Sequence, residues 1–119
     1  MEIEYSRENS ILIITLFEDI DQHTTDKIRR KIDNEIEKYI PRKVILDFSN
    51  ITFMDSSGIG MVIGRYKLVK MLGGNLELKN VNKSTKKIFD MSGVTRLINI
   101  INVKENLNIK GDNLNEGII

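Results

Sequence analysis

The chain has 119 residues and a nearly balanced charge, with 18 lysines and arginines against 17 aspartates and glutamates and a formal net charge of +1. This balance excludes the basic footprint that marks nucleic-acid-binding proteins and proteins drawn to anionic membranes. The absence of cysteine excludes a disulfide framework, a thiolate metal site and a cysteine nucleophile.

Two strands joined by a turn are predicted at the start of the chain. Polar and apolar residues alternate over residues 2–6, and the polar residues 7–10 are turn formers. Residues 11–17 form an almost continuous run of β-branched and aromatic side chains. Such a run indicates a strand that is covered over much of its surface.

The next segment has the pattern of an amphipathic helix from about His23 to Ile40. Asp21 or Thr24 is the candidate cap at its start, because both side chains can accept hydrogen bonds from helix N–H groups. Pro41 ends the helix, since proline lacks an N–H and disfavours helical geometry in the residue before it. The apolar positions recur every four residues and therefore share one face: Ile28, Ile32, Ile36 and Ile40.

A third strand is predicted over residues 43–48, with residues 51–53 extending it. A second helix follows from about Ser57 to Leu72, and Gly73-Gly74 ends it through a left-handed cap. One stripe of this helix follows helical spacing and should face the sheet: Ile59, Val62, Ile63, Tyr66 and Val69.

The remaining elements are shorter. We predict a fourth strand over residues 75–79 and a third helix from about Lys83 to Met91 that ends at Ser92-Gly93. A last strand is predicted over residues 97–101. Asn102 and Glu105 have the spacing of a capping box, which predicts a brief terminal helix.

The order of these elements, β-β-α-β-α-β-α-β with a possible final helix, predicts one α/β domain over residues 1–110. Its mixed sheet should have about four or five strands, with helices packed on it and right-handed crossovers. Residues 111–119 hold little to bury and are expected to fray. Neither an apolar run of membrane length nor a signal-peptide pattern is present, so we expect a soluble cytoplasmic protein.

The most informative segment is Asp55-Ser56-Ser57-Gly58, where the third strand gives way to the second helix. One interpretation is purely local, since Asp and Ser are preferred helix caps. The other uses the same geometry: a phosphate on an exposed hydroxyl there would meet free N–H groups and the positive end of the helix dipole. It would add about −1.5 to −2 charges. Asp55 would repel that charge, so the main effect would fall on a partner, which must then desolvate a dianion.

Three segments in order resemble the anti-sigma factor antagonists of the STAS domain family, and most closely those of the sporulation type. The segments are Phe-Met-Asp-Ser-Ser-Gly at 53–58, Gly-Arg-Tyr-Lys at 64–67 and Phe-Asp-Met-Ser-Gly at 89–93. The resemblance covers roughly residues 3–107 and implies a STAS-type fold. It also implies a non-enzymatic protein without a cofactor or a metal.

The function implied by this resemblance is partner switching. The unphosphorylated antagonist binds an anti-sigma factor that is also a serine kinase with its bound nucleotide, and the sigma factor is released. The kinase then phosphorylates the antagonist and lets it go, and a serine phosphatase resets the cycle. Neither a nucleic acid nor a membrane is implied as a partner.

Carried over residue by residue, the resemblance implies phosphorylation at Ser56, the serine directly after the motif aspartate. Asp21 and Thr24 are equally well explained as helix caps. Met61, with Leu68 and Leu72, either packs on a neighbouring helix or forms an exposed patch for docking. The candidate partner-binding residues lie at both helix starts and along the second helix: Asp21, His23, Thr24, Asp55, Ser57, Gly58, Met61 and Arg65.

Other functions are less well supported by the residues. The alternative to the switch is a STAS module of another signalling assembly, or a sensor of a small ligand or nucleotide. A hydrolase is not indicated, because His23 is the only histidine and no G-x-S-x-G elbow is present. Gly58, Gly60 and Gly64 lack the Lys-Ser/Thr of a P-loop, and one histidine without cysteine does not indicate a transition-metal site.

Overall fold

The computed structural model describes residues 1–102, whose five strands form one sheet in chain order. The first two strands pair antiparallel, and the other three neighbouring pairs are parallel. The sheet is therefore mixed, as predicted. The strands are β1 (Glu2–Ser6), β2 (Ile11–Thr15), β3 (Lys43–Asp47), β4 (Asn75–Lys79) and β5 (Ile100–Ile101).

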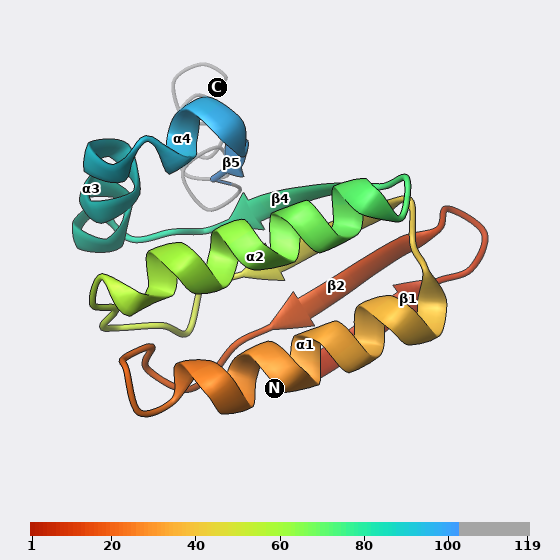
Figure 1. Ribbon diagram of the computed structural model, residues 1–119, viewed down its shortest axis with the longest axis horizontal. Coiled ribbons are helices and arrows are strands. Elements are labelled where there is room, and N and C mark those ends of the chain that lie inside the picture. The colour runs from red at the N-terminus through yellow and green to blue at the C-terminus, as the bar shows by residue number, and fades with distance from the viewer. Residues whose placement is uncertain (103–119) are drawn as a thin grey trace, which may run out of the picture.

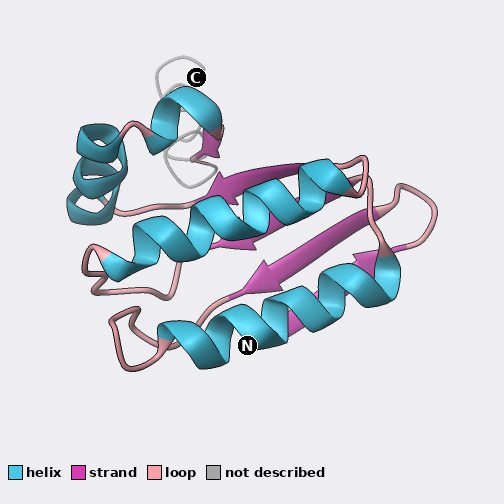
Figure 2. Ribbon diagram, viewed as in Figure 1, coloured by secondary structure: helices cyan, strands magenta, loops and turns pink. Residues whose placement is uncertain are grey.

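Two long helices lie side by side on one face of this sheet, and two short ones lie beyond the carboxyl end of β4 (Figures 1 and 2). The long helices start at the same end of the molecule, where β2 and β3 finish. The helices are α1 (Thr25–Tyr39), α2 (Ser57–Met71), α3 (Lys83–Ser92) and α4 (Val94–Leu97).

The core lies between the sheet and the two long helices. Every second residue of β2, β3 and β4 is buried, because successive side chains of a strand point to opposite faces. The parallel register aligns these residues in two rows, Leu12–Val44–Leu76 and Ile14–Leu46–Leu78. Burial of each such side chain contributes about 1.5–3 kcal/mol. The helices supply Ile28, Ile32, Ile36, Val62 and Val69 to the same core.

Helix α1 is one residue shorter at its end than the apolar pattern predicts. Ile40 was expected on the buried stripe, but it is 56% exposed and has a positive φ of 42°. It caps the helix with its N–H on the carbonyl of Ile36, and Pro41 follows directly. The prediction of a buried Ile40 was therefore wrong, because the proline forces the chain out of the helix one residue early.

Two strand predictions were also wrong. Residues 51–53 do not extend β3; Ile51 is buried in a loop, and the nearby pairing is a single parallel bridge between Met54 and Ile20. The last strand is only Ile100–Ile101, because Leu97 ends the short helix α4. The left-handed Gly93, with φ of 85°, ends α3 and begins α4 within one residue.

Some predictions fall on residues outside the described part of the chain. The partner Glu105 of the proposed capping box, the domain end at 110 and the frayed tail 111–119 all lie beyond residue 102.

Candidate functional site

Two loops meet at the end of the sheet where α1 and α2 begin (Figure 1). They are joined by the parallel bridge between Ile20 and Met54. The Ile20 N–H donates to the Phe53 carbonyl at 3.0 Å, and the Asp55 N–H donates to the Ile20 carbonyl at 2.9 Å. Because both loops carry a helix start, this bridge brings the two helix N-termini together.

Asp19 ties the same loops together through its side chain. Its Oδ1 accepts hydrogen bonds from the Thr52 N–H at 3.3 Å, the Thr52 hydroxyl at 3.0 Å and the Phe53 N–H at 3.2 Å. The sequence pattern around Asp19 gives no sign of partners 33 residues away. Asp19 therefore joins the loop that precedes α1 to the loop that precedes Ser56.

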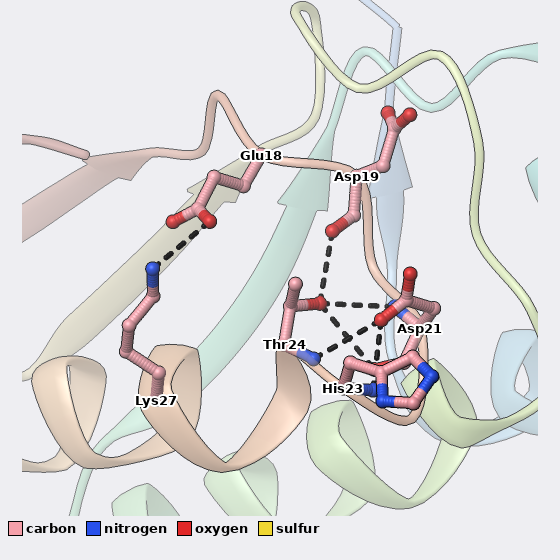
Figure 3. Close-up of polar contacts among 6 residues, drawn as sticks. All are labelled: Glu18, Asp19, Asp21, His23, Thr24 and Lys27. Atoms are coloured by element: carbon pink, nitrogen blue, oxygen red, sulfur yellow. Dashed lines mark hydrogen bonds and ion pairs between the residues drawn. The ribbon is translucent and has the colours of Figure 1, made fainter.

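The start of α1 is closed by a local network (Figure 3). Asp21 Oδ1 accepts from the N–H groups of His23 at 2.8 Å and Thr24 at 3.1 Å. The Thr24 hydroxyl accepts from the Asp21 N–H at 3.0 Å and donates to the Asp19 carbonyl at 2.9 Å. Asp21 therefore bonds the turn that leads into the helix. Thr24 is the N-cap residue, but its side chain bonds no helix N–H, so the capping prediction was wrong for Thr24.

The start of α2 is built differently. Ser56 is the N-cap residue, yet its side chain makes no capping hydrogen bond and the residue is exposed. The carboxylate of Asp55 bonds the helix start in its place, since its Oδ1 accepts from the Ser57 N–H at 2.9 Å and from the Ser57 hydroxyl at 2.5 Å. Of the two adjacent serines, one has an open hydroxyl and the other has a bonded one.

The N–H groups at this helix start already have acceptors. Those of Ser57, Gly58 and Ile59 donate to the Asp55 carboxylate, the Asp55 carbonyl and the Ser56 carbonyl respectively. The expectation that a phosphate would find free N–H groups there was therefore wrong for these three residues. A phosphate on Ser56 would not be neutralised by them unless the turn rearranged.

Hydrogen bonding keeps Asp55 ionised. The bond from the Ser57 hydroxyl, followed by that from the Ser57 N–H, lowers the pKa of Asp55 below its usual value of 3.8, against a smaller opposing effect of burial. The backbone of Gln22 and the nearby His23 lower it further. Since Gln22 and His23 belong to the other loop, the carboxylate lies at the point where the two helix starts face each other.

Gly58 fits tightly below this turn. A Cβ at this position would lie 2.3 Å from Met54 Sδ and 3.2 Å from Ile20 Cγ2. Both of those residues form the bridge between the loops. Close packing against Met54 is therefore enough to explain the glycine, without the predicted partner contact.

Two other predicted contact residues are buried. Met61 is 4% exposed and belongs to the core, and Arg65 is 7% exposed. Arg65 Nε lies 2.6 Å from Asp33 Oδ1 on α1, in an ion pair whose N–H does not point straight at the oxygen, and Arg65 Nη1 donates to the Met61 carbonyl. Arg65 thus joins α1 and α2, and neither side chain is exposed enough to form part of a partner surface.

A hollow on the described part of the chain lies away from these loops. It has a volume of about 790 Å³, and its lining comes from the loops that follow β3 and β4, from α3 and from β5. None of the predicted site residues lines it. A ligand sensor, the alternative predicted from the sequence, would use this hollow and not the Asp55–Gly58 turn.

Three negative findings concern residues 1–102. No hydrogen bond joins Ser56 to His23, so the constellation of a Ser-His-Asp hydrolase is not formed in this region. Within the same residues no group of three or more acidic or histidine side chains has the arrangement to hold a metal ion. None of the helices described is long and apolar enough to cross a membrane.

Comparison with known proteins agrees with this architecture. The STAS domain model matches residues 2–108. An anti-sigma F factor antagonist of Paenibacillus polymyxa is 35% identical over 100 residues, which are 84% of this chain and 86% of that protein.

Two solved structures of the anti-sigma factor antagonist SpoIIAA share 29% identity with the chain. The unphosphorylated form has a TM-score of 0.71 and covers 92% of this chain and 96% of its own. The phosphorylated form, from Bacillus, has a TM-score of 0.64 and covers 90% and 96%. The chain therefore belongs to the STAS domain family and is a relative of the anti-sigma F factor antagonists.

Proposed function

We propose that this chain is an anti-sigma factor antagonist whose binding is controlled by phosphorylation of Ser56. Unphosphorylated, it binds in the cytoplasm to an anti-sigma factor that is also a serine kinase, and the sigma factor is released. The kinase then uses its bound nucleoside triphosphate to phosphorylate Ser56, and the complex separates. A serine phosphatase restores the first state. The chain is a ligand and a substrate in this cycle and not an enzyme.

The open hydroxyl of Ser56 is the observation that carries this proposal. It is exposed and makes no capping hydrogen bond, so a kinase can reach it without breaking a local interaction. In the transfer, Ser56 Oγ forms a bond to the terminal phosphorus, the bond from that phosphorus to the bridging oxygen breaks, and nucleoside diphosphate leaves. The hydroxyl proton passes to a base of the kinase or to water. The existence of SpoIIAA in a phosphorylated form supports the same chemistry here.

Release follows from charge. Phosphorylation adds about −1.5 to −2 charges beside the ionised Asp55. The neighbouring N–H groups of Ser57 and Gly58 are already bonded, so they do not offset this charge. A partner surface that accepted a neutral serine would have to desolvate a dianion, which is costly without a matching cation. Partner contacts are proposed for the exposed or half-buried residues around it: Asp21, His23, Thr24, Asp55 and Ser57.

The test uses the purified chain, the anti-sigma factor kinase from the same genome, and Mg-ATP. We expect a complex on a sizing column, one added phosphate by intact mass, and dissociation of the complex once the phosphate is present. Trypsin cleaves after Lys43 and Arg65, so the phosphate can be mapped within peptide 44–65.

Three variants separate the parts of the proposal. Ser56→Ala should bind the kinase without accepting phosphate, Ser56→Asp should bind more weakly, and the matched control Ser57→Ala should still be phosphorylated. A complex that never acquires phosphate would leave a binding module without the switch. If the experiment yields neither a complex nor a phosphorylated chain, the ligand-sensor alternative is favoured.

A further inference from the structure

Two serines with identical chemistry stand side by side at the start of α2, and a kinase that reaches one reaches the neighbourhood of the other. We propose that Asp55 is a specificity-determining residue: by holding the Ser57 hydroxyl, it confines phosphoryl transfer from the kinase-bound nucleoside triphosphate to Ser56. This inference rests on the proposed function, and it concerns which hydroxyl is used, not whether the switch exists.

The geometry of Ser57 restrains its side chain. Its N–H and its hydroxyl both donate to the same Oδ1 of Asp55, and these two hydrogen bonds together fix the orientation of the side chain. Ser57 is half-buried, whereas Ser56 is exposed and makes no capping hydrogen bond. For Ser57 to attack, its hydroxyl must first give up the hydrogen bond to Asp55 and turn outward. For Ser56 to attack, no hydrogen bond within the chain has to break.

The charge of the acceptor strengthens this restraint. The Ser57 hydroxyl lowers the pKa of Asp55, so the acceptor is an ionised carboxylate at neutral pH. A hydrogen bond to an ionised group is roughly twice as strong as one between neutral groups. A phosphate placed on Ser57 would also stand directly against this carboxylate, whose oxygen lies 2.5 Å from the Ser57 hydroxyl. Both effects act against transfer to Ser57.

Two other turns in the chain show that this arrangement is not automatic. Asp47 has the same spacing to Ser49, yet its Oδ1 accepts only from the Ser49 N–H, at 2.9 Å. Asn82 accepts from the Ser84 hydroxyl at 3.1 Å, but an amide oxygen carries no charge. Of these three turns, the one at Asp55 alone combines a carboxylate with a bonded hydroxyl.

The experiment measures the ratio of phosphate on Ser57 to phosphate on Ser56 in peptide 44–65, by fragmentation mass spectrometry after incubation with the kinase and Mg-ATP. Asp55→Ala removes the acceptor and should raise this ratio by roughly 10- to 100-fold, the range expected for loss of a hydrogen bond to a charged group. Asp55→Asn keeps an acceptor without the charge and should raise it less. Because both sites lie in one molecule, a weaker overall reaction does not disturb the ratio.

A second pair of variants makes the test independent of competition between the serines. Ser56→Ala alone should carry no phosphate, and the double variant Asp55→Ala/Ser56→Ala should gain it on Ser57. Asp47→Ala is the matched control, since it opens a similar turn elsewhere and should leave the ratio unchanged. Circular dichroism of each variant shows whether the fold is kept.

The outcomes are distinct. Phosphate confined to Ser56 in both Asp55 variants overturns the inference while leaving the proposed switch intact. Loss of all phosphate in both variants also overturns it, because Asp55 would then serve the kinase and not the choice of serine. A wild-type chain that is never phosphorylated overturns the inference together with the proposed function.

Discussion

The starts of α1 and α2 both have an aspartate bonded to backbone N–H groups, but they differ in whether the hydroxyl of the N-cap residue is hydrogen-bonded. Each is preceded by an aspartate that bonds N–H groups of the next residues, Asp21 before α1 and Asp55 before α2. At α1 the N-cap hydroxyl of Thr24 is held on both sides, by the Asp21 N–H and the Asp19 carbonyl. At α2 the N-cap hydroxyl of Ser56 makes no capping bond. The Thr24 hydroxyl is used in hydrogen bonds within the fold, whereas the Ser56 hydroxyl is available for the phosphoryl transfer proposed above.

The two helix starts keep their positions only if α1 and α2 stay packed together. Arg65 on α2 pairs with Asp33 on α1, so its removal should have the largest effect. Arg65→Ala leaves Asp33 without its partner across the helix interface. We expect a loss of about 3 kcal/mol in the free energy of unfolding, the lower end for a broken buried ion pair because Asp33 is partly exposed. Urea denaturation measures this loss.

Arg29→Ala is the control for that prediction. Arg29 approaches the same Asp33 only to 4.0 Å, and its side chain is far more exposed. Its removal should change stability by less than about 1 kcal/mol. Equal losses for the two variants would show that Arg65 has no special part in joining the helices.

Gly58→Ala tests the contact between the loops. The added Cβ would overlap the Met54 side chain and crowd Ile20, and both belong to the bridge that aligns the helix starts. We expect a loss of about 1–3 kcal/mol, as for overpacking in a filled core. Gly60→Ala is the matched control, since a Cβ there meets nothing within 4 Å and should stabilise the helix by about 0.5–1 kcal/mol. Thermal unfolding distinguishes the two, and a neutral Gly58→Ala would contradict the packing argument.

Thr24→Val measures how much the hydrogen-bonded hydroxyl of Thr24 contributes to stability. The substitution keeps the shape of the side chain and removes its hydrogen bonds to the Asp21 N–H, the Asp19 carbonyl and, at 3.3 Å, the Asp21 carbonyl. We expect a loss of about 1–2 kcal/mol in the free energy of unfolding, as for hydrogen bonds removed from partly buried groups. Chemical denaturation of the purified variant provides the value.

Ser56→Ala measures the open hydroxyl in the same assay. Since the Ser56 side chain makes no capping bond, the change should fall within about 0.5 kcal/mol, well below the usual cost of replacing a serine cap. A loss as large as that of Thr24→Val would erase the distinction between the two helix starts.

The smallest effect concerns pH. The pKa of Asp55 is lower in the folded chain than its usual value of 3.8, so its contribution to stability is complete above that value. The contribution disappears as the pH falls through the lower folded pKa. The difference in urea midpoint between wild type and Asp55→Asn should therefore shrink in acid. A difference that stays constant down to about pH 2.5 would contradict a lowered pKa.

Much of this fold could be predicted from the sequence, because periodicity reports local burial. The repeat of Ile28, Ile32 and Ile36 placed α1, and the bounds of β4 were predicted correctly. The errors lie where periodicity gives no information. Helix α4 is a single turn, and residues 51–53 lie in a loop that is bonded to a distant segment of the chain.

For the candidate site, the sequence predicted the turn between the third strand and the second helix but not its hydrogen bonds, and the functional roles of its residues stay a prediction. The Asp-Ser-Ser-Gly motif indicated the turn, and the structure shows which serine is open. Asp19 could not be found from one sequence, because its partners Thr52 and Phe53 are distant in the chain. For Met61 the sequence left open whether it packs inside or forms an exposed patch, and the structure places it in the core. Arg65 was expected at a partner surface, but it is buried and pairs with Asp33 of α1.

The order of the strands in the sheet has a consequence for how the chain acquires its structure. Since β1 to β5 are neighbours in the sheet in the same order as in the sequence, each strand pairs with the one made just before it. The parallel pairs nevertheless join distant segments, Ile11 with Lys43 and Lys43 with Asn75, because a helix lies between the strands. Such non-local pairing slows folding, whereas β1 and β2 are joined by a short turn. We therefore expect the antiparallel pair of β1 and β2 to form before the parallel pairs that hold the helix bearing Ser56.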